Sequence, residues 1–60
     1  MRKFNVVFEV FDDNGAKEFK TISVEAGNKK IAAIRGMSEI NKLEGYSGKY
    51  KNVKRVEEVT

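Results

Sequence analysis

Sixty residues, of which 40% are hydrophobic and 35% charged, predict one small globular domain. The sequence contains no Cys and no His, which excludes disulfides, thiolate or imidazole metal ligands and the commonest general base. The net charge of +3 is a mild basic excess that ordinary solubilising charge also explains. No apolar run approaches the roughly 18 residues of a spanning helix, so we expect a cytoplasmic protein without a membrane partner.

Residues 3–25 predict a β-hairpin. Apolar and mixed positions alternate over residues 3–11, which is the period of a strand. The apolar face of this strand consists of Phe4, Val6, Phe8 and Val10. Asn14 and Gly15 follow, and Asn-Gly between two alternating runs is the strongest short hairpin signal. A second strand is therefore expected over residues 17–25.

The length of the hairpin loop decides which faces of the two strands meet. A two-residue loop would place Val6 opposite Ser23, which puts the apolar faces out of register. A three-residue loop over residues 13–15, with Gly15 in the left-handed conformation of a G1 bulge, instead places Val6 opposite Ile22. We predict the three-residue loop because it keeps the apolar faces together.

Residues 29–43 predict a helix, with Asn28 as N-cap and Gly45 as the stop beyond its C-terminus. At 100° per residue, one side gathers apolar residues and should cover the sheet. That side consists of Ala33, Met37 and Ile40, with Ile34 and Leu43 at its margins. Gly36 lies beside the stripe and costs about 1 kcal/mol relative to Ala in a helix, which a close approach of the backbone to the sheet would offset.

A third strand is predicted over residues 50–59, after a glycine-containing loop at 44–49. Val53, Val56 and Val59 are spaced by three, which fits neither face of a regular strand and indicates a bulge or an edge position. With the helix as the crossover, this strand pairs antiparallel with the first strand. The predicted fold is α+β: a single ββαβ domain, with a three-stranded sheet of order 2-1-3 and one helix on one face.

The acidic and glycine-containing segments offer no catalytic site. Asp12 and Asp13 adjoin the Asn-Gly turn, where carboxylates usually serve the hydrogen bonds of the turn itself. Residues 45–49 superficially resemble a phosphate-binding loop, but they follow a helix and open a strand, which is the reverse of the required order. We therefore expect no catalytic residue, no metal and no cofactor, and hence a protein that is not an enzyme.

The sheet face away from the predicted helix carries apolar groups without cover. The register places Glu9 opposite Phe19 and Val7 opposite Thr21, with Phe11 on the same face. These five residues predict a protein-binding surface, used for a partner of unknown identity or for self-association as a homodimer. The alternative is that Phe11 and Phe19 merely shield each other, since single exposed apolar residues are common.

Basic residues alternate with tyrosines in the C-terminal third of the chain. The set consists of Tyr46, Lys49, Tyr50, Lys51, Lys54 and Arg55. Lysines contact phosphates and aromatic rings stack on unpaired bases, so single-stranded nucleic-acid binding is the alternative function. Lysines on an edge strand also prevent aggregation.

The predicted pairing further brings Glu57 and Glu58 towards Arg2 and Lys3, and Lys51 and Lys54 towards Glu9, Asp12 and Asp13.

Residues 4–11, the Asp-Asn-Gly turn, residues 22–26 and residues 54–59 together resemble small uncharacterised proteins encoded by bacteriophages and other mobile elements. The resemblance covers nearly the whole chain. It implies a compact, non-enzymatic protein that binds and modulates a macromolecule of a host or virus. No functional residue carries over from this resemblance.

Overall fold

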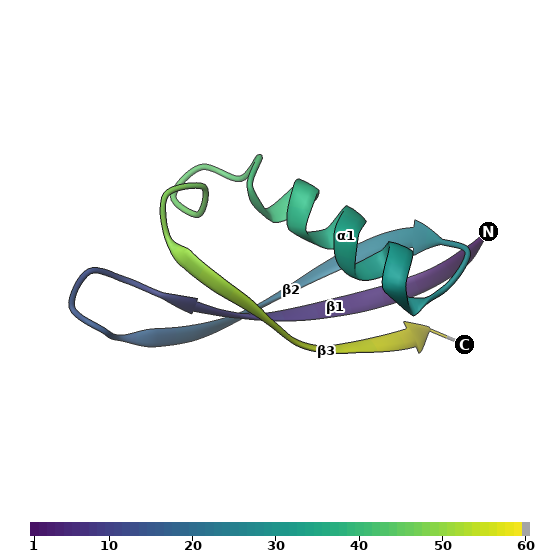
Figure 1. The fold of residues 1–60 in the computed structure, drawn as a ribbon, viewed down its shortest axis with the longest axis horizontal. Coiled ribbons are helices and arrows are strands. Elements are labelled where there is room, and N and C mark those ends of the chain that lie inside the picture. The colour runs from purple at the N-terminus through teal and green to yellow at the C-terminus, as the bar shows by residue number, and fades with distance from the viewer. Residues whose placement is uncertain (60) are drawn as a thin grey trace.

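Four elements make up the computed structural model, which describes residues 1–59 (Figure 1). In chain order they are β1 (Arg2–Phe11), β2 (Lys17–Ala26), α1 (Lys29–Ile40) and β3 (Tyr50–Val59). The strands form one antiparallel sheet in the order β2-β1-β3, and α1 lies across one face of it. The predicted α+β class, its ββαβ order and its sheet order are confirmed.

The β1–β2 hairpin has the predicted three-residue loop. The Asp12 amide donates to the Ala16 carbonyl at 3.0 Å, and the Gly15 amide donates to the Asp12 carbonyl at 3.0 Å. Gly15 has a φ of 82°, which glycine adopts without the clash that a Cβ would cause. Val6 consequently lies opposite Ile22, as predicted.

The hairpin extends beyond the end of α1, so the molecule is elongated, with extents of 37 × 18 × 15 Å (Figure 1). At the opposite end of the sheet, α1 and the three strands form two layers. The hairpin tip is therefore a single layer of two strands.

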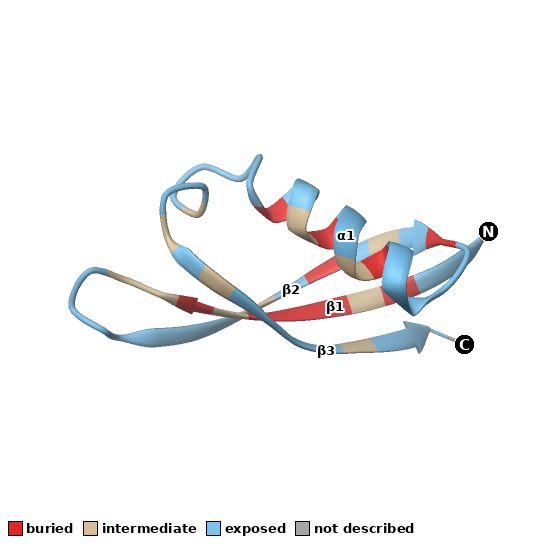
Figure 2. Ribbon diagram, in the orientation of Figure 1, coloured by how far each residue is buried: buried red, intermediate tan, exposed pale blue. Residues whose placement is uncertain are grey.

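The core lies between α1 and the sheet, and β1 supplies its centre (Figure 2). This strand is paired on both sides, and alternate side chains point towards the helix. The residues with at most 1% of their surface exposed are Phe4, Val6, Phe8, Val10, Ala26, Ala32 and Ile40. Within residues 1–59 no polar side chain is buried, so apolar burial and packing stabilise this core.

Helix α1 begins as predicted and ends earlier. The side-chain oxygen of Asn28 accepts a hydrogen bond from the Ile31 amide at 2.9 Å, which satisfies a donor that the helix leaves unpaired. The helix ends at Ile40, because the next residues form tighter turns in which the Leu43 amide donates to the Ile40 carbonyl at 3.1 Å. The predictions of a helix to Leu43 and a stop at Gly45 are wrong; Gly45 lies within the α1–β3 loop.

The buried face of α1 is rotated from the predicted one. Its buried residues are Ala32, Gly36 and Ile40. Ala33 and Met37, predicted at its centre, are only half-buried. A Cβ on Gly36 would lie 3.0 Å from the Cβ of Val6, so the helix backbone itself packs on β1 at this position. The predicted close approach is confirmed. It rotates the buried face of α1 so that Gly36 lies against β1.

Strand β3 contains the expected bulge. The register with β1 shifts between Val7 and Phe8, which face Arg55 and Val53, so Lys54 is the extra residue. The shift places the first two of the three predicted valines on the helix side of the sheet, which accounts for their spacing. The third valine pairs on the opposite side.

Candidate binding surface

The sheet face opposite α1, here called the open face, is covered by no other element of residues 1–59 (Figure 1). Odd-numbered residues of β1 and β2 point to this face because the even-numbered ones point towards α1. Five rows cross it, from the hairpin end: Lys17, Phe11 and Tyr50; Phe19, Glu9 and Asn52; Thr21, Val7 and Arg55; Ser23, Asn5 and Glu57; Glu25, Lys3 and Val59.

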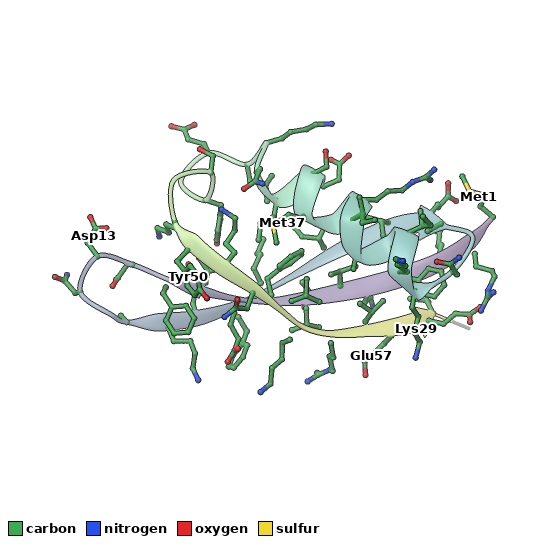
Figure 3. The ribbon with its side chains drawn as sticks, viewed as in Figure 1. Met1, Asp13, Lys29, Met37, Tyr50 and Glu57 are labelled. Atoms are coloured by element: carbon green, nitrogen blue, oxygen red, sulfur yellow. The ribbon has the colours of Figure 1, made fainter. Side chains whose placement is uncertain are left out.

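Three aromatic residues in the first two rows form what we call the aromatic cluster: Phe11, Phe19 and Tyr50. The rings of Phe11 and Tyr50 contact each other, with centroids 5.7 Å apart and planes inclined by 44°. Phe19 is 57% exposed and Tyr50 is 67% exposed, although such side chains usually contribute large buried areas. Figure 3 shows Tyr50 near the hairpin turn, which Asp13 marks.

A charged pair lies within the aromatic cluster. Lys17 places its Nζ 3.5 Å from a carboxylate oxygen of Glu9 and 5.5 Å from the ring centroid of Phe19. Glu9 is half-buried between its neighbours on β2 and β3. The lysine therefore offsets the single carboxylate in these two rows and also contacts an exposed ring.

The five residues predicted as the protein-binding surface lie together on the open face, but they differ in accessibility. Val7 is only 6% exposed, so the prediction that it offers an uncovered apolar contact is wrong. Its neighbours across β2 and β3 are Thr21 and Arg55, and long side chains cover apolar surface with their stems. Sequence reasoning missed Tyr50 as a member of this face; the signal for it was its place opposite Phe11 in the antiparallel pairing.

The six residues predicted as a nucleic-acid surface do not form one surface. Tyr46 packs against the core on the helix side, and its ring has the ammonium groups of Lys20 and Lys49 at 5.8 and 5.6 Å from its centroid. Tyr50 lies on the open face, opposite Phe11. The two tyrosines are therefore on opposite sides of the sheet.

Lys51 contributes to the structure of the α1–β3 loop. Its Nζ donates to the carbonyls of Tyr46 and Lys49 at 2.7 and 2.8 Å. The register places Lys51 opposite Val10, next to Glu9, as predicted, but no ion pair joins it to the acidic groups of the hairpin in residues 1–59, and its ammonium group bonds to loop carbonyls instead. Lys54, predicted to approach the same acidic groups, lies at the bulge, and no ion pair joins it to them in residues 1–59.

The predicted pairing of the chain's basic start with its acidic end is confirmed for one pair. The guanidinium of Arg2 donates to both carboxylate oxygens of Glu58, at 2.9 and 2.6 Å. The hydrogen bond from Arg2 lowers the pKa of Glu58, and partial desolvation opposes that effect. This pair joins β1 to β3 at the end of the sheet remote from the aromatic cluster.

Asp12 serves the hydrogen bonds of the hairpin turn. One side-chain oxygen of Asp12 accepts hydrogen bonds from the amides of Asn14 and Ala16, both at 2.9 Å. Among residues 1–59, no three or more carboxylates are placed to hold a metal ion. The one helix in this range is too short and too polar to cross a membrane.

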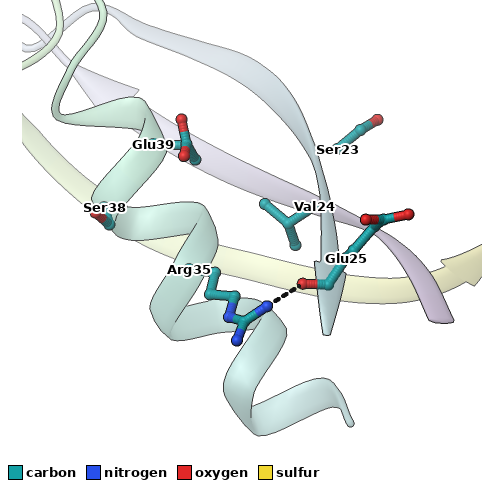
Figure 4. Close-up of a pocket in the computed structure, with 6 residues that line it drawn as sticks. All are labelled: Ser23, Val24, Glu25, Arg35, Ser38 and Glu39. Carbon is teal, nitrogen blue, oxygen red and sulfur yellow. Dashed lines mark hydrogen bonds between the residues drawn. The ribbon is translucent and has the colours of Figure 1, made fainter. Parts of the chain in front are cut away.

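A groove of about 370 Å³ runs between the outer edge of β2 and α1 (Figure 4). Arg35 crosses it from the helix, and its Nη1 donates to the Glu25 carbonyl at 2.8 Å. The lining residues are Ser23, Val24, Glu25, Arg35, Ser38 and Glu39. The groove combines both signs of charge with the backbone of the β2 edge, and it shares Ser23 and Glu25 with the margin of the open face.

A scan against protein-family models finds no match to this chain, and searches of curated proteins and of solved structures find no significant similarity. No partner, activity or functional residue therefore carries over from a relative. The resemblance to phage-encoded proteins stays a prediction.

Proposed function

We propose that the chain is a non-catalytic protein-binding module that binds and modulates a partner protein through the aromatic cluster of its open face. The exposure of Phe19 and Tyr50 on paired strands carries this proposal. Aromatic rings are enriched at the centres of protein interfaces. Strand pairing already fixes the backbone that carries these side chains, so binding orders less of the chain than it would on a loop.

The charges around the aromatic cluster indicate the chemistry of the partner. Lys17 borders the cluster on β2, and Lys54 and Arg55 follow on β3, just beyond it. Glu9 is offset by the nearby Lys17 ammonium. A partner surface with an apolar centre and an acidic rim complements this arrangement.

Affinity capture from cells that encode the chain, followed by a binding measurement with the purified captured protein, tests this proposal. Wild type is compared with the Phe19→Ser/Tyr50→Ser variant. Both side chains are largely exposed, so the variant should fold while its affinity falls at least tenfold.

Ile34→Ser is the matched control, because Ile34 is 59% exposed on the helix, away from the open face. It should bind the partner as wild type does. A captured protein that binds the cluster variant with unchanged affinity would exclude the open face as its site. Circular dichroism of all three proteins separates lost binding from lost folding.

Self-association through the open face belongs to the same proposal and has a separate test. A second copy on this face would enlarge the small apolar core of a 60-residue chain. Sedimentation equilibrium of wild type and of Phe11→Ser/Phe19→Ser measures it. A dimer that the double substitution removes supports the open face, and a strictly monomeric wild type at high concentration excludes it.

Single-stranded nucleic-acid binding is the second candidate, because exposed Tyr50 shares β3 with Lys54 and Arg55. The other predicted members of that surface are engaged in the loop. Fluorescence anisotropy with labelled dT20 and U20 at low salt tests it. Binding should weaken steeply with salt and be lost in Tyr50→Ser; no anisotropy change at low salt would exclude it.

A further inference from the structure

The outer edge of β2 carries unpaired backbone groups. Within residues 1–59, β2 pairs only with β1, and hydrogen-bonded pairs recur at every second residue of an antiparallel ladder. The hydrogen bond from the Asp12 amide to the Ala16 carbonyl shows which residues of the ladder are hydrogen-bonded. The backbone amides and carbonyls of even-numbered β2 residues therefore bond to β1, and those of odd-numbered residues point away from it. Arg35 bonding the Glu25 carbonyl from outside the sheet agrees with this alternation (Figure 4).

The two edges of the sheet differ. β3 has its bulge at Lys54, which disrupts the regular spacing that another strand needs. β2 pairs with β1 without any register shift from Lys17 to Ala26. Its outward amides and carbonyls at Phe19, Thr21 and Ser23 are therefore a regular template for one more strand.

We propose that a second copy of this chain adds to the β2 edge, so that the two β2 strands pair antiparallel about a two-fold axis at Thr21. This inference goes beyond the proposed function, because it uses the edge of the sheet and not the open face. It commits to a homodimer because the side chains of β2 complement those of a second β2 in this register.

Charge complementarity is the first argument for a centre at Thr21. Lys17 of each copy lies opposite Glu25 of the other, so the same ion pair forms twice in the symmetric ladder. The remaining opposed pairs are Phe19 with Ser23, Glu18 with Val24, and Lys20 with Ile22. No like charges face each other over residues 17–25.

The neighbouring registers of the two β2 strands either match charges less well or form a shorter ladder. A centre at Lys20 places two ammonium groups directly opposite each other, which is destabilising. A centre at Phe19 pairs Glu18 with Lys20 but limits the ladder to residues 17–21, because β2 begins at Lys17. A centre at Ile22 forms no ion pair. The register at Thr21 is therefore the one that combines a long ladder with matched charges.

The groove beside α1 accommodates the second copy. Glu18 of that copy lies opposite Val24, which lines the groove, and its carboxylate faces the region that holds Arg35. Of the two acidic residues that line the groove, Glu39 has the Lys42 ammonium at 3.6 Å, and Glu25 is the residue that pairs with Lys17 of the second copy. The Glu25 carbonyl has two lone pairs, so it can accept from Arg35 and from a backbone amide of the second copy.

Joining two β2 edges makes a continuous sheet with both open faces on the same side. Two aromatic clusters then share one surface, and a partner with two binding sites would gain avidity. That last consequence rests on the proposed function; the dimer itself does not.

Charge reversal tests the dimer. Sedimentation equilibrium should give wild type a mass of twice 6.8 kDa at high concentration. Lys17→Glu and Glu25→Lys should each weaken the dimer roughly tenfold or more, because each places like charges together at both ends of the ladder. The double variant Lys17→Glu/Glu25→Lys restores the pairing and should dimerise as wild type does.

Lys30→Glu is the matched control, since it changes the net charge equally from an exposed position on α1. Hydrogen exchange gives an independent readout: the amides of Phe19, Thr21 and Ser23 should gain protection with protein concentration. A monomeric wild type, single reversals that dimerise normally, or a double variant that folds but stays monomeric would each overturn the proposal. A dimer sensitive to Phe11→Ser/Phe19→Ser but not to Lys17→Glu would assign self-association to the open face instead.

Discussion

Gly36 sets the distance between α1 and the sheet. Its backbone packs directly on Val6, a fully buried residue of the central strand. A side chain here would have to displace a β-branched residue that is held between two neighbouring strands. The helix tolerates the low propensity of glycine at this position because close packing offsets it.

Gly36→Ala should destabilise the protein by about 1 kcal/mol net. Overpacking against Val6, with contacts of 3.0 to 3.1 Å to its side chain, outweighs the gain in helix propensity. Gly48→Ala is the control, because nothing lies within 4 Å of its added Cβ and its φ is not positive. Urea denaturation of the two variants measures the difference; equal free energies of unfolding would contradict the close approach.

The Arg2–Glu58 pair makes stability depend on pH. The hydrogen bond from Arg2 lowers the pKa of Glu58 from its ordinary value of 4.5 in the folded chain. The stabilisation is therefore fully present above that ordinary value and is lost as the pH falls through the lowered pKa. In an NMR titration, Arg2→Met should raise the pKa of Glu58 towards 4.5, whereas Arg35→Met should leave it unchanged. An unaltered Glu58 titration in Arg2→Met would contradict the pairing.

At the scale of elements, the hairpin depends on one residue with positive φ. Gly15→Val should cost about 2 kcal/mol, because a β-branched residue is strained at a φ of 82°. Gly15→Asn should cost less, since Asn visits this region more readily. Gly27→Val, at a glycine whose φ is not positive, should change stability little. Equal melting temperatures for Gly15→Asn and Gly15→Val in thermal unfolding would argue against the positive φ as the cause of the destabilisation.

One ammonium group bridges two carbonyls of the α1–β3 loop. Lys51→Met removes the hydrogen bonds to the carbonyls of Tyr46 and Lys49. The Lys49 amide, which donates to the Tyr46 carbonyl at 3.2 Å, should then exchange with deuterium faster. Lys54→Met, at the bulge of the same strand, should leave this exchange rate unchanged. Identical rates in Lys51→Met and wild type would show that the loop holds its own shape.

The elements that the sequence predicts well are those specified by local chemistry. Asn14 and Gly15 indicate the turn, and matching the apolar faces is enough to predict the register of the hairpin. Asn28 marks the start of α1 in the same way. The buried face of α1 was predicted in the wrong rotation. Gly36 lies at the centre of that face, but a projection of apolar side chains gives a glycine no weight. The position of the bulge could not be predicted, because it depends on which valines of β3 meet β1.

The candidate site was predictable only in part. The hairpin register places Phe11 and Phe19 on the open face, and this follows from sequence. The burial of Val7 depends on side chains from both neighbouring strands, and the separation of Tyr46 from Tyr50 depends on the path of the α1–β3 loop. Contacts between elements decide both features. The two tyrosines were predicted to share a surface because they are close in sequence.

At the scale of the whole molecule, the two edges of the sheet should behave differently. Deleting Lys54 removes the extra residue and should leave β3 as regular as β2, with Val53 and Val56 still on the helix side. This variant should form species larger than wild type does at the same concentration, because both edges can then pair. Lys54→Ala keeps the bulge and controls for the lost charge. Light scattering compares them; equal masses for the deletion and Lys54→Ala would contradict a protective bulge.

The hairpin carries Phe11 and Phe19 of the aromatic cluster close to its tip, which projects past α1 as a single layer of two strands. Segments with few buried contacts open locally at a lower free energy than global unfolding requires. The amides near the tip should therefore exchange with solvent through frequent partial opening, while those of the helix-covered half exchange only when the whole chain unfolds. A bound protein would suppress this partial opening. Binding would then be seen as slower amide exchange near the hairpin tip.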